Sequence, residues 1–206
     1  MNRCWKIIGN RRQPLVSGAE FTYPADGKWT EHTDKIGLCS WGYHYCEGKH
    51  VLEWLNTGLL AEVEPCPKHK PKKGDNKNVT CQLRIVRTFP LTARVLRRFA
   101  CDCAERALER EREHDREPDE RSWNAVRVAR RYAFGKATKA ELDAAWDAAR
   151  AAGAAARDAA RDAAWDAARA AARYAARAAA RDAARAAERE WQYHRLLQIV
   201  GAEEGR

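Results

Sequence analysis

Three residues in the first half of the chain, Cys39, His44 and Cys46, have side chains that can bind a metal ion or take part in catalysis. They form the pattern Cys-x4-His-x-Cys, and Cys66 with His69 adds a second pair downstream. Thiolate and imidazole are typical ligands of tetrahedral zinc, so the candidate metal ligands are Cys39, His44, Cys46 and Cys66. The spacing differs from the paired Cys-x2-Cys of zinc knuckles. Buried free cysteines with a structural histidine would explain the pattern equally well.

His44 and Cys46 also allow a catalytic interpretation. Residues i and i+2 of a strand point to the same face, so a thiolate and an imidazole could meet there. However, no orienting Asn or Asp and no Gly-rich anion loop can be identified in the sequence. The phosphate-loop, Rossmann, nucleophile-elbow and His-Glu-x-x-His signatures do not occur either. We therefore expect a binding protein, and an enzyme is the class that the sequence supports least.

Aromatic residues and lysines are concentrated around the same pattern. Flat rings beside cations can stack a nucleobase and neutralise its phosphate, although a small β domain would also use such rings as its core. Arginines of the second half could contribute to the same function. The candidate ligand-binding residues are Trp41, Tyr43, His44, Tyr45, Arg84, Arg169 and Arg173.

The chain is basic, with a formal net charge of +9 and an isoelectric point near 9.3. This charge favours an anionic partner, such as a nucleotide, a nucleic acid or an acidic protein. The N-terminus has no apolar run of signal-peptide length, and no stretch is long and apolar enough for a membrane span. We expect a cytoplasmic protein with no membrane partner. Seven cysteines without an export signal make a disulfide framework unexpected.

Residues 1–90 show the pattern of a small, mostly antiparallel β domain. Short apolar runs broken by Gly, Pro, Asn and Asp predict strands at 4–8, 21–23, 59–65 and 80–89. Residues 50–58 predict one short helix that ends at a glycine. The Lys- and Pro-rich segment 65–78 predicts a hairpin loop.

Residues 91–206 show helical periodicity throughout, and they predict an all-α, Ala-rich helical bundle. Thr92 is a suitable N-cap for the first helix, and a second helix should begin near Asp119 and end at Gly135. Thr138 and Glu141 form a capping box that predicts the start of a third helix. The whole chain is therefore expected to belong to the α+β class.

The alanine tract has Arg or Trp at every fourth residue from Arg157 to Arg189. Four residues advance an α-helix by about 400°, so the polar position drifts about 40° per repeat and cannot stay on one face of a long straight helix. We expect several shorter helices, with turns at Gly153 and between Ala167 and Ala179. Asp–Arg pairs at i, i+3 favour a solvated, salt-bridged face, and a ligand-binding surface is the alternative.

The first half resembles an uncharacterised domain common in bacteriophage and prophage genes. The resemblance covers roughly residues 4–89 and is carried by GLCSWGYHYCEGKHVLEWL, AEVEP and CQLRIVRTF. In that family the order is Cys, Gly-Phe-His-x-Cys, a short helix, Val-Glu and a closing Ile-x-Ile-Val strand. The matching residues here are Cys39, Gly42, Tyr43, His44 and Cys46, with Tyr in place of Phe. The family brings no established activity.

The second half is similar to Ala-rich helical immunity proteins of bacterial toxin systems. The similarity covers roughly residues 91–201, and its most specific features are the cluster Pro118, Asp119 and Arg121 and the helix stop at Phe134-Gly135. Both resemblances imply a gene from the conflict between phages and bacteria, which would place the protein in the cytoplasm of a bacterial host.

These observations predict a non-enzymatic phage or prophage protein that counters bacterial defence by sequestering an anionic, nucleotide-type signal. One alternative is an immunity- or inhibitor-type protein that occludes a bacterial toxin or defence protein. Another is a nucleic-acid-binding protein, although the interspersed Asp residues argue mildly against it. We expect a homo-oligomer, and we expect no cofactor apart from the structural zinc ion that the Cys and His residues could hold.

Overall fold

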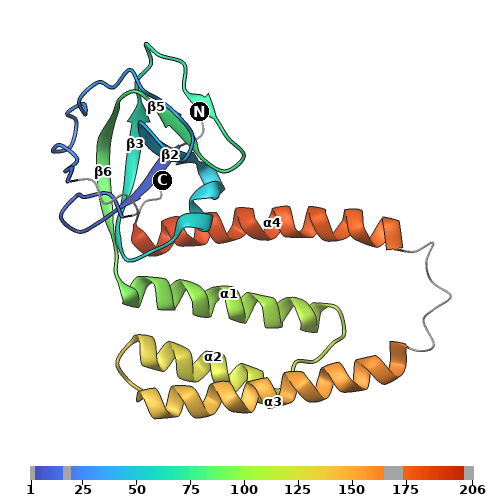
Figure 1. Cartoon of the computed structure of the whole chain (residues 1–206). Helices are drawn as coiled ribbons and strands as arrows, with labels where there is room; N and C mark the ends of the chain where they lie inside the picture. The colour runs from blue at the N-terminus through green and yellow to red at the C-terminus, as the bar shows by residue number, and fades with distance from the viewer. Residues whose placement is uncertain (1–2, 16–19, 165–173, 202–206) are drawn as a thin grey trace. The chain divides into compact units, whose positions relative to one another are not determined.

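The computed structural model describes residues 3–15, 20–164 and 174–201, and it leaves out the side chains of 152–164 and 174–184 (Figure 1). It confirms the α+β class, because a six-stranded antiparallel sheet precedes the α-helices of the described chain. Two compact units are present. The β unit comprises residues 1–93 and 189–206, and the helical unit comprises residues 94–188. The predicted boundary after residue 90 is near this division, but the C-terminal segment clusters with the β unit.

The sheet of the β unit has the strand order β4-β5-β2-β1-β3-β6. Its strands are β1 Cys4–Ile8, β2 Tyr43–Glu47, β3 Gly58–Pro65, β4 Lys72–Lys73, β5 Asn78–Thr80 and β6 Leu83–Leu91. The strands predicted at 4–8 and 59–65 are therefore present, and the predicted strand at 80–89 corresponds mainly to β6. The predicted strand at 21–23 is not formed. Phe21 and Tyr23 instead lie in a loop and pack against the core of the sheet.

The predicted helix at 50–58 is a shorter 3-10 helix, η1 Gly48–Trp54. Gly58 does not end it but begins β3, with a φ of +145°. A Cβ at Gly58 would lie 2.3 Å from the carbonyl oxygen of Ile8, so only glycine allows β1 and β3 to approach so closely at this point.

One face of the sheet forms an aromatic and aliphatic core. The buried members of this cluster are Ile8, Tyr23, Tyr45, Ala61, Val63, Leu83 and Ile85. A β-bulge in the β3–β6 pairing, at Glu62/Val63, shifts the register. Glu62 pairs with Arg87 and Val63 with Ile85, so Val86 is the extra residue of the bulge, and it is 47% exposed. The bulge thus breaks the simple alternation read from the sequence and turns Arg87 towards Glu62.

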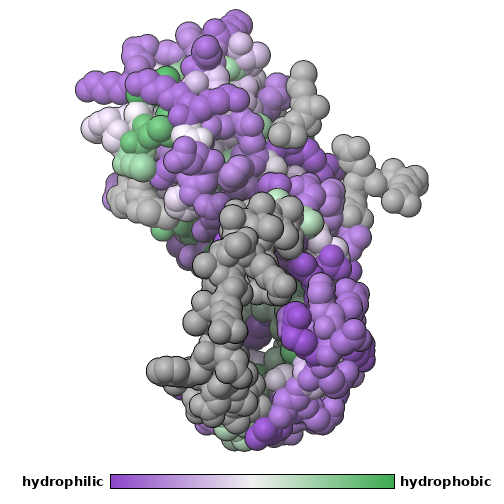
Figure 2. All heavy atoms as spheres, turned by 90° about the vertical axis from the view of Figure 1, so that its right-hand side faces the viewer, coloured by the Kyte–Doolittle hydropathy of each residue, from purple (hydrophilic) through white to green (hydrophobic). Residues whose placement is uncertain are grey.

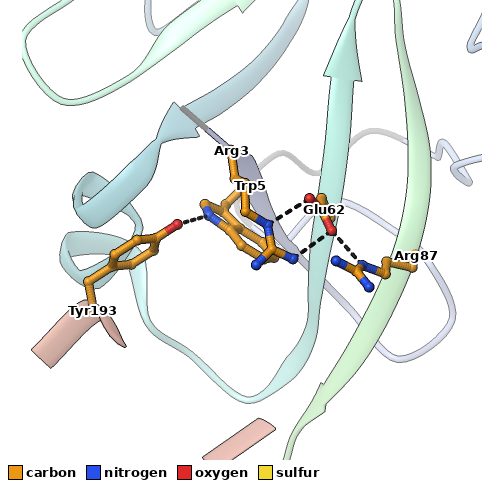
Figure 3. A network of polar contacts seen from close by, with 5 residues as sticks. All are labelled: Arg3, Trp5, Glu62, Arg87 and Tyr193. Carbon is orange, nitrogen blue, oxygen red and sulfur yellow. Dashed lines mark hydrogen bonds and ion pairs between the residues drawn. The ribbon is translucent and has the colours of Figure 1, made fainter. Parts of the chain in front are cut away.

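The other face of the sheet carries Trp5, which is completely buried. Its indole Nε1 donates a hydrogen bond of 2.8 Å to the hydroxyl of Tyr193, in the last turns of α4 Tyr174–Val200 (Figure 3). Beside it, Glu62 accepts hydrogen bonds from the guanidinium groups of Arg3 and Arg87 (Figure 3). The network joins the first strand to β3, β6 and a segment close to the C-terminus.

The helical unit contains α1 Ala93–Glu113, α2 Glu120–Ala133, α3 Lys139–Ala164 and the first part of α4. The unit begins at Arg94, the second residue of α1. The caps predicted for α2 and for the start of α3 are confirmed. Asp119 accepts a hydrogen bond from the backbone N–H of Arg121, and Gly135 follows α2 with a φ of +70°. At the start of α3, Glu141 accepts from the backbone N–H of Thr138 at 2.7 Å, and Thr138 Oγ1 accepts from that of Glu141 at 3.2 Å.

The predicted turn at Gly153 is wrong, because α3 continues through this residue. A single glycine costs a helix only about 1 kcal/mol, and the good helix formers around it compensate. The second turn was expected between Ala167 and Ala179. Part of that interval, residues 167–173, lies outside the described residues, and α4 begins at Tyr174.

Ion pairs connect the helices of this unit. Arg130 of α2 pairs with Asp102 of α1, a carboxylate whose side chain is only 6% exposed. Glu188 of α4 accepts hydrogen bonds from Arg106 and Arg110 of α1. Most of the coloured side chains on the face drawn in Figure 2 are hydrophilic. None of the described helices is both long and apolar enough to cross a membrane.

Tyr193→Phe is expected to lower the free energy of unfolding by about 1–3 kcal/mol, because it leaves the buried indole N–H of Trp5 without an acceptor. Urea unfolding followed by tryptophan fluorescence would measure the loss. Tyr132→Phe, in α2, is the matched control and should change the stability little. Equal stabilities of the two variants would show that the hydrogen bond is unimportant.

The pKa of Glu62 is lowered, mainly by the hydrogen bonds from Arg3. Its charged pairs should therefore stabilise the protein above the ordinary pKa of 4.5, and this contribution should disappear as the pH falls through the lowered value. We expect Glu62→Gln to be destabilising at neutral pH, with a difference from the parent protein that shrinks in acid. Urea unfolding as a function of pH tests this, with Glu64→Gln as the control. A difference that does not depend on pH would contradict it.

Candidate functional site

The loop before β2 is shaped by Gly42 and His44. Gly42 has a φ of +95°, and a Cβ there would lie 2.8 Å from the Val79 side chain and 3.0 Å from the carbonyl oxygen of Thr80. Glycine is thus required where the loop passes β5. The ring of His44 folds back, and its Nε2 accepts a hydrogen bond of 3.1 Å from the backbone N–H of Cys39. The pattern Cys-x2-Gly-x-His therefore has a local structural role in holding this loop.

Cys46 is buried in β2, opposite Trp5 of β1. Burial raises the pKa of its thiol to about 12, so it is protonated and a poor nucleophile at neutral pH. Burial also lowers the pKa of His44. The neighbouring Lys6 donates a hydrogen bond of 2.6 Å to the carbonyl oxygen of His44, and burial lowers the pKa of Lys6 to about 8. The arrangement is that of a packed strand pair and not of an activated thiolate.

Two of the predicted ligand-binding residues belong to the core. Tyr45 is 2% exposed, and Tyr43 packs its ring against Phe21 and Tyr23. Arg84 forms an ion pair of 2.6 Å with Glu64, and its guanidinium lies 5.1 Å from the ring centroid of Trp29. Arg169 and Arg173 lie outside the described residues.

Trp41 is open to solvent, with 64% of it exposed. The ammonium group of Lys35 lies 5.7 Å from the centroid of its ring. A second pair has the same chemistry, since the ammonium group of Lys77 lies 4.7 Å from the centroid of Trp54, which is 38% exposed. In both pairs a cation stands beside an indole that a ligand could reach.

The β4–β5 hairpin connects these two pairs. Lys72 of β4 donates a hydrogen bond of 2.7 Å to the carbonyl oxygen of Ile36, in the loop that carries Lys35 and Trp41. At the other end of the hairpin, Asn76 donates a hydrogen bond of 2.6 Å to Glu53 of η1, next to Trp54. We call these residues the basic aromatic surface, and they are Lys35, Trp41, Trp54, Lys72 and Lys77.

The Cys and His residues that come together differ from the predicted zinc ligands. Among the described residues, the group that could hold a metal ion is His32, His69 and Cys81, whose ligand atoms all lie within 4.8 Å of one another. Cys39, His44, Cys46 and Cys66 do not form such a group. In the sequence, His69 stands out only for its spacing from Cys66. No local pattern in the sequence connects it with His32 and Cys81, because three separate loops bring them together.

No protein-family model matches the chain, and no curated protein or solved structure was found to be similar to it.

Gly42→Ala and Gly48→Ala form a matched pair of variants. Both glycines have a positive φ, so alanine should cost about 1–2 kcal/mol at either position. Only at Gly42 would the new Cβ collide with β5, while Gly48 faces open space. We expect Gly42→Ala to lose about 1–3 kcal/mol more in urea unfolding than Gly48→Ala, because of overpacking. Equal losses would show that the loop does not need the close approach.

Proposed function

We propose that this protein binds an anionic ligand with an aromatic base, of the nucleotide type, on the basic aromatic surface of its β unit, and that it does not transform it. The observation that carries the proposal is Trp41, an indole 64% exposed with the ammonium group of Lys35 beside it. Base stacking on an aromatic side chain contributes about 1–3 kcal/mol per base, and adjacent lysines supply the attraction to phosphate.

The distribution of cations supports this location. Lys35, Lys72 and Lys77 of the surface belong to two segments that touch, the loop before β2 and the β4–β5 hairpin. Lys73 adds a further ammonium group to the hairpin, 71% exposed and 3.9 Å from Glu47. Several lysines close to two accessible indoles are a suitable combination for a base and its phosphate.

A binding role without catalysis agrees with the protonation of the Cys46 thiol and with the hydrogen bond of the His44 ring. The Cys46 thiol, with a pKa raised to about 12, is not a nucleophile at neutral pH. The His44 ring uses Nε2 to accept the backbone N–H of Cys39. Sequestration of a signal in the conflict between phage and bacterium is the setting that we propose, and this part rests only on the two resemblances described in the sequence analysis.

A second candidate function, binding to a toxin or defence protein, is favoured by one feature of the helical unit. Trp146 of α3 is 62% exposed, and Phe134 at the end of α2 is 41% exposed. Large aromatic side chains are common anchors of protein interfaces. Under this alternative, Trp146→Ala would abolish complex formation and Trp41→Ala would not.

Trp41→Ala is expected to weaken nucleotide binding by about 10- to 100-fold, as the loss of one stacking contact implies. Isothermal titration calorimetry with nucleoside triphosphates, cyclic dinucleotides and a short oligothymidine would identify the preferred class and measure the loss. Trp146→Ala is the matched control, because Trp146 is almost as exposed but lies in the other unit.

Three outcomes separate the alternatives. Binding of a mononucleotide or dinucleotide that is lost only in Trp41→Ala supports the proposal. Binding of the oligothymidine alone, with an affinity that falls steeply with salt, would replace it by a function in binding nucleic acid. If none of these probes binds, or if the two tryptophan variants behave alike, the basic aromatic surface is not a ligand site.

A further inference from the structure

A cluster of two imidazoles and a thiol lies in the β unit, apart from the predicted Cys and His motif. His32 belongs to the loop between Trp29 and Ile36, His69 to the connection between β3 and β4, and Cys81 to the connection between β5 and β6. The ring centroids of the two histidines are 5.2 Å apart. Both histidines are exposed, while Cys81 is buried with 5% exposure.

Backbone hydrogen bonds bring these loops to the same place. The N–H of Thr33, the residue after His32, donates to the carbonyl oxygen of Cys81 at 3.1 Å. The N–H of Cys66 donates to the carbonyl oxygen of Gln82 at 3.0 Å, and this anchors the start of the segment with His69. The positions of the three side chains are therefore set by the backbone next to the β5–β6 connection.

The surroundings of the cluster are suited to a metal ion. Within the described part of the chain, the side chains of His69 and Cys81 have no hydrogen-bond partner, so both remain available as ligands. Asp34 Oδ1 lies 3.5 Å from His32 Nδ1. A carboxylate at one ring nitrogen is the usual way to orient a histidine whose other nitrogen binds a metal, which leaves Nε2 of His32 for that role.

We propose that His32, His69 and Cys81 bind one Zn²⁺ ion, with a water molecule as the fourth ligand. A ligand set of two imidazoles and one thiolate favours zinc over magnesium or calcium. Around a tetrahedral zinc ion with bond lengths of about 2.0–2.3 Å, the ligand atoms lie about 3.3–3.7 Å from one another. The ligand atoms of this cluster lie within 4.8 Å of one another, so small side-chain rotations would bring them to these distances. The ion would tie the two loops to the sheet. This proposal does not depend on the function proposed above.

Cobalt is a suitable probe, because Co²⁺ takes the place of Zn²⁺ and is coloured when a thiolate and imidazoles surround it. The full chain is treated with a chelator, dialysed and titrated with Co²⁺, then with Zn²⁺ in competition. We expect one equivalent of Co²⁺ to give a thiolate-to-cobalt charge-transfer band together with the visible bands of tetrahedral cobalt. Zn²⁺ should displace the cobalt and raise the midpoint of thermal unfolding.

Variants test the ligand assignment. His32→Ala and His69→Ala are the main ones, because both side chains are exposed and their removal should leave the fold intact, as circular dichroism would show. Each should abolish binding of one stoichiometric ion, and Cys81→Ser should remove the charge-transfer band. Asp34→Asn should weaken Zn²⁺ binding by at least about tenfold without changing the stoichiometry.

His44→Ala and Cys39→Ser are the controls, because they remove ligands of the alternative set without touching this cluster. Both should bind Co²⁺ like the parent protein. The proposal is overturned if the parent protein gives no tetrahedral thiolate spectrum. It is equally overturned if folded His32→Ala and His69→Ala variants bind the ion normally, or if only the His44 and Cys39 variants lose it.

Discussion

The buried hydrogen bond between Trp5 and Tyr193 is the interaction on which the β unit depends most. It links the first strand to the last helix across 188 positions of sequence, and both side chains are excluded from solvent. A buried indole N–H without an acceptor would cost more than the bond itself contributes, so the contact specifies where the C-terminal segment lies. Leu196 and Leu197, both buried, add apolar area to the same segment. The β unit is therefore complete only when residues 189–201 are in place.

Buried side chains occupy both faces of the sheet, so the segments that connect the strands are the parts that can carry function. The aromatic core around Tyr23 and Tyr45 supports β2, and β2 in turn positions the loop that presents Trp41. Gly42 and His44 fix the shape of that loop, and Lys72 fastens it to the β4–β5 hairpin. An exposed indole on a loop held by such contacts needs less ordering when a ligand binds, which favours recognition by stacking.

Local signals in the sequence predicted much of the fold. The Asp119 cap, the Thr138–Glu141 box and the strand at 4–8 each depend on neighbouring residues, and all three are present. Gly153 was misread because one glycine among alanines costs a helix little. The predicted ligand-binding residues include both an exposed ring, Trp41, and a buried one, Tyr45. The sequence alone does not show which aromatic side chains are buried. The cluster of His32, His69 and Cys81 could not be predicted, because it depends on tertiary hydrogen bonds between three loops.

The central claim is that the basic aromatic surface is where the ligand binds. The most direct test is a titration of the 15N-labelled protein with the tightest-binding nucleotide, followed through the indole N–H resonances of its eight tryptophans. The account predicts large shifts for Trp41 and Trp54 and none for Trp146. If the largest shifts occur in Trp146 or elsewhere in the helical unit, or if no indole responds, the basic aromatic surface is not the binding site.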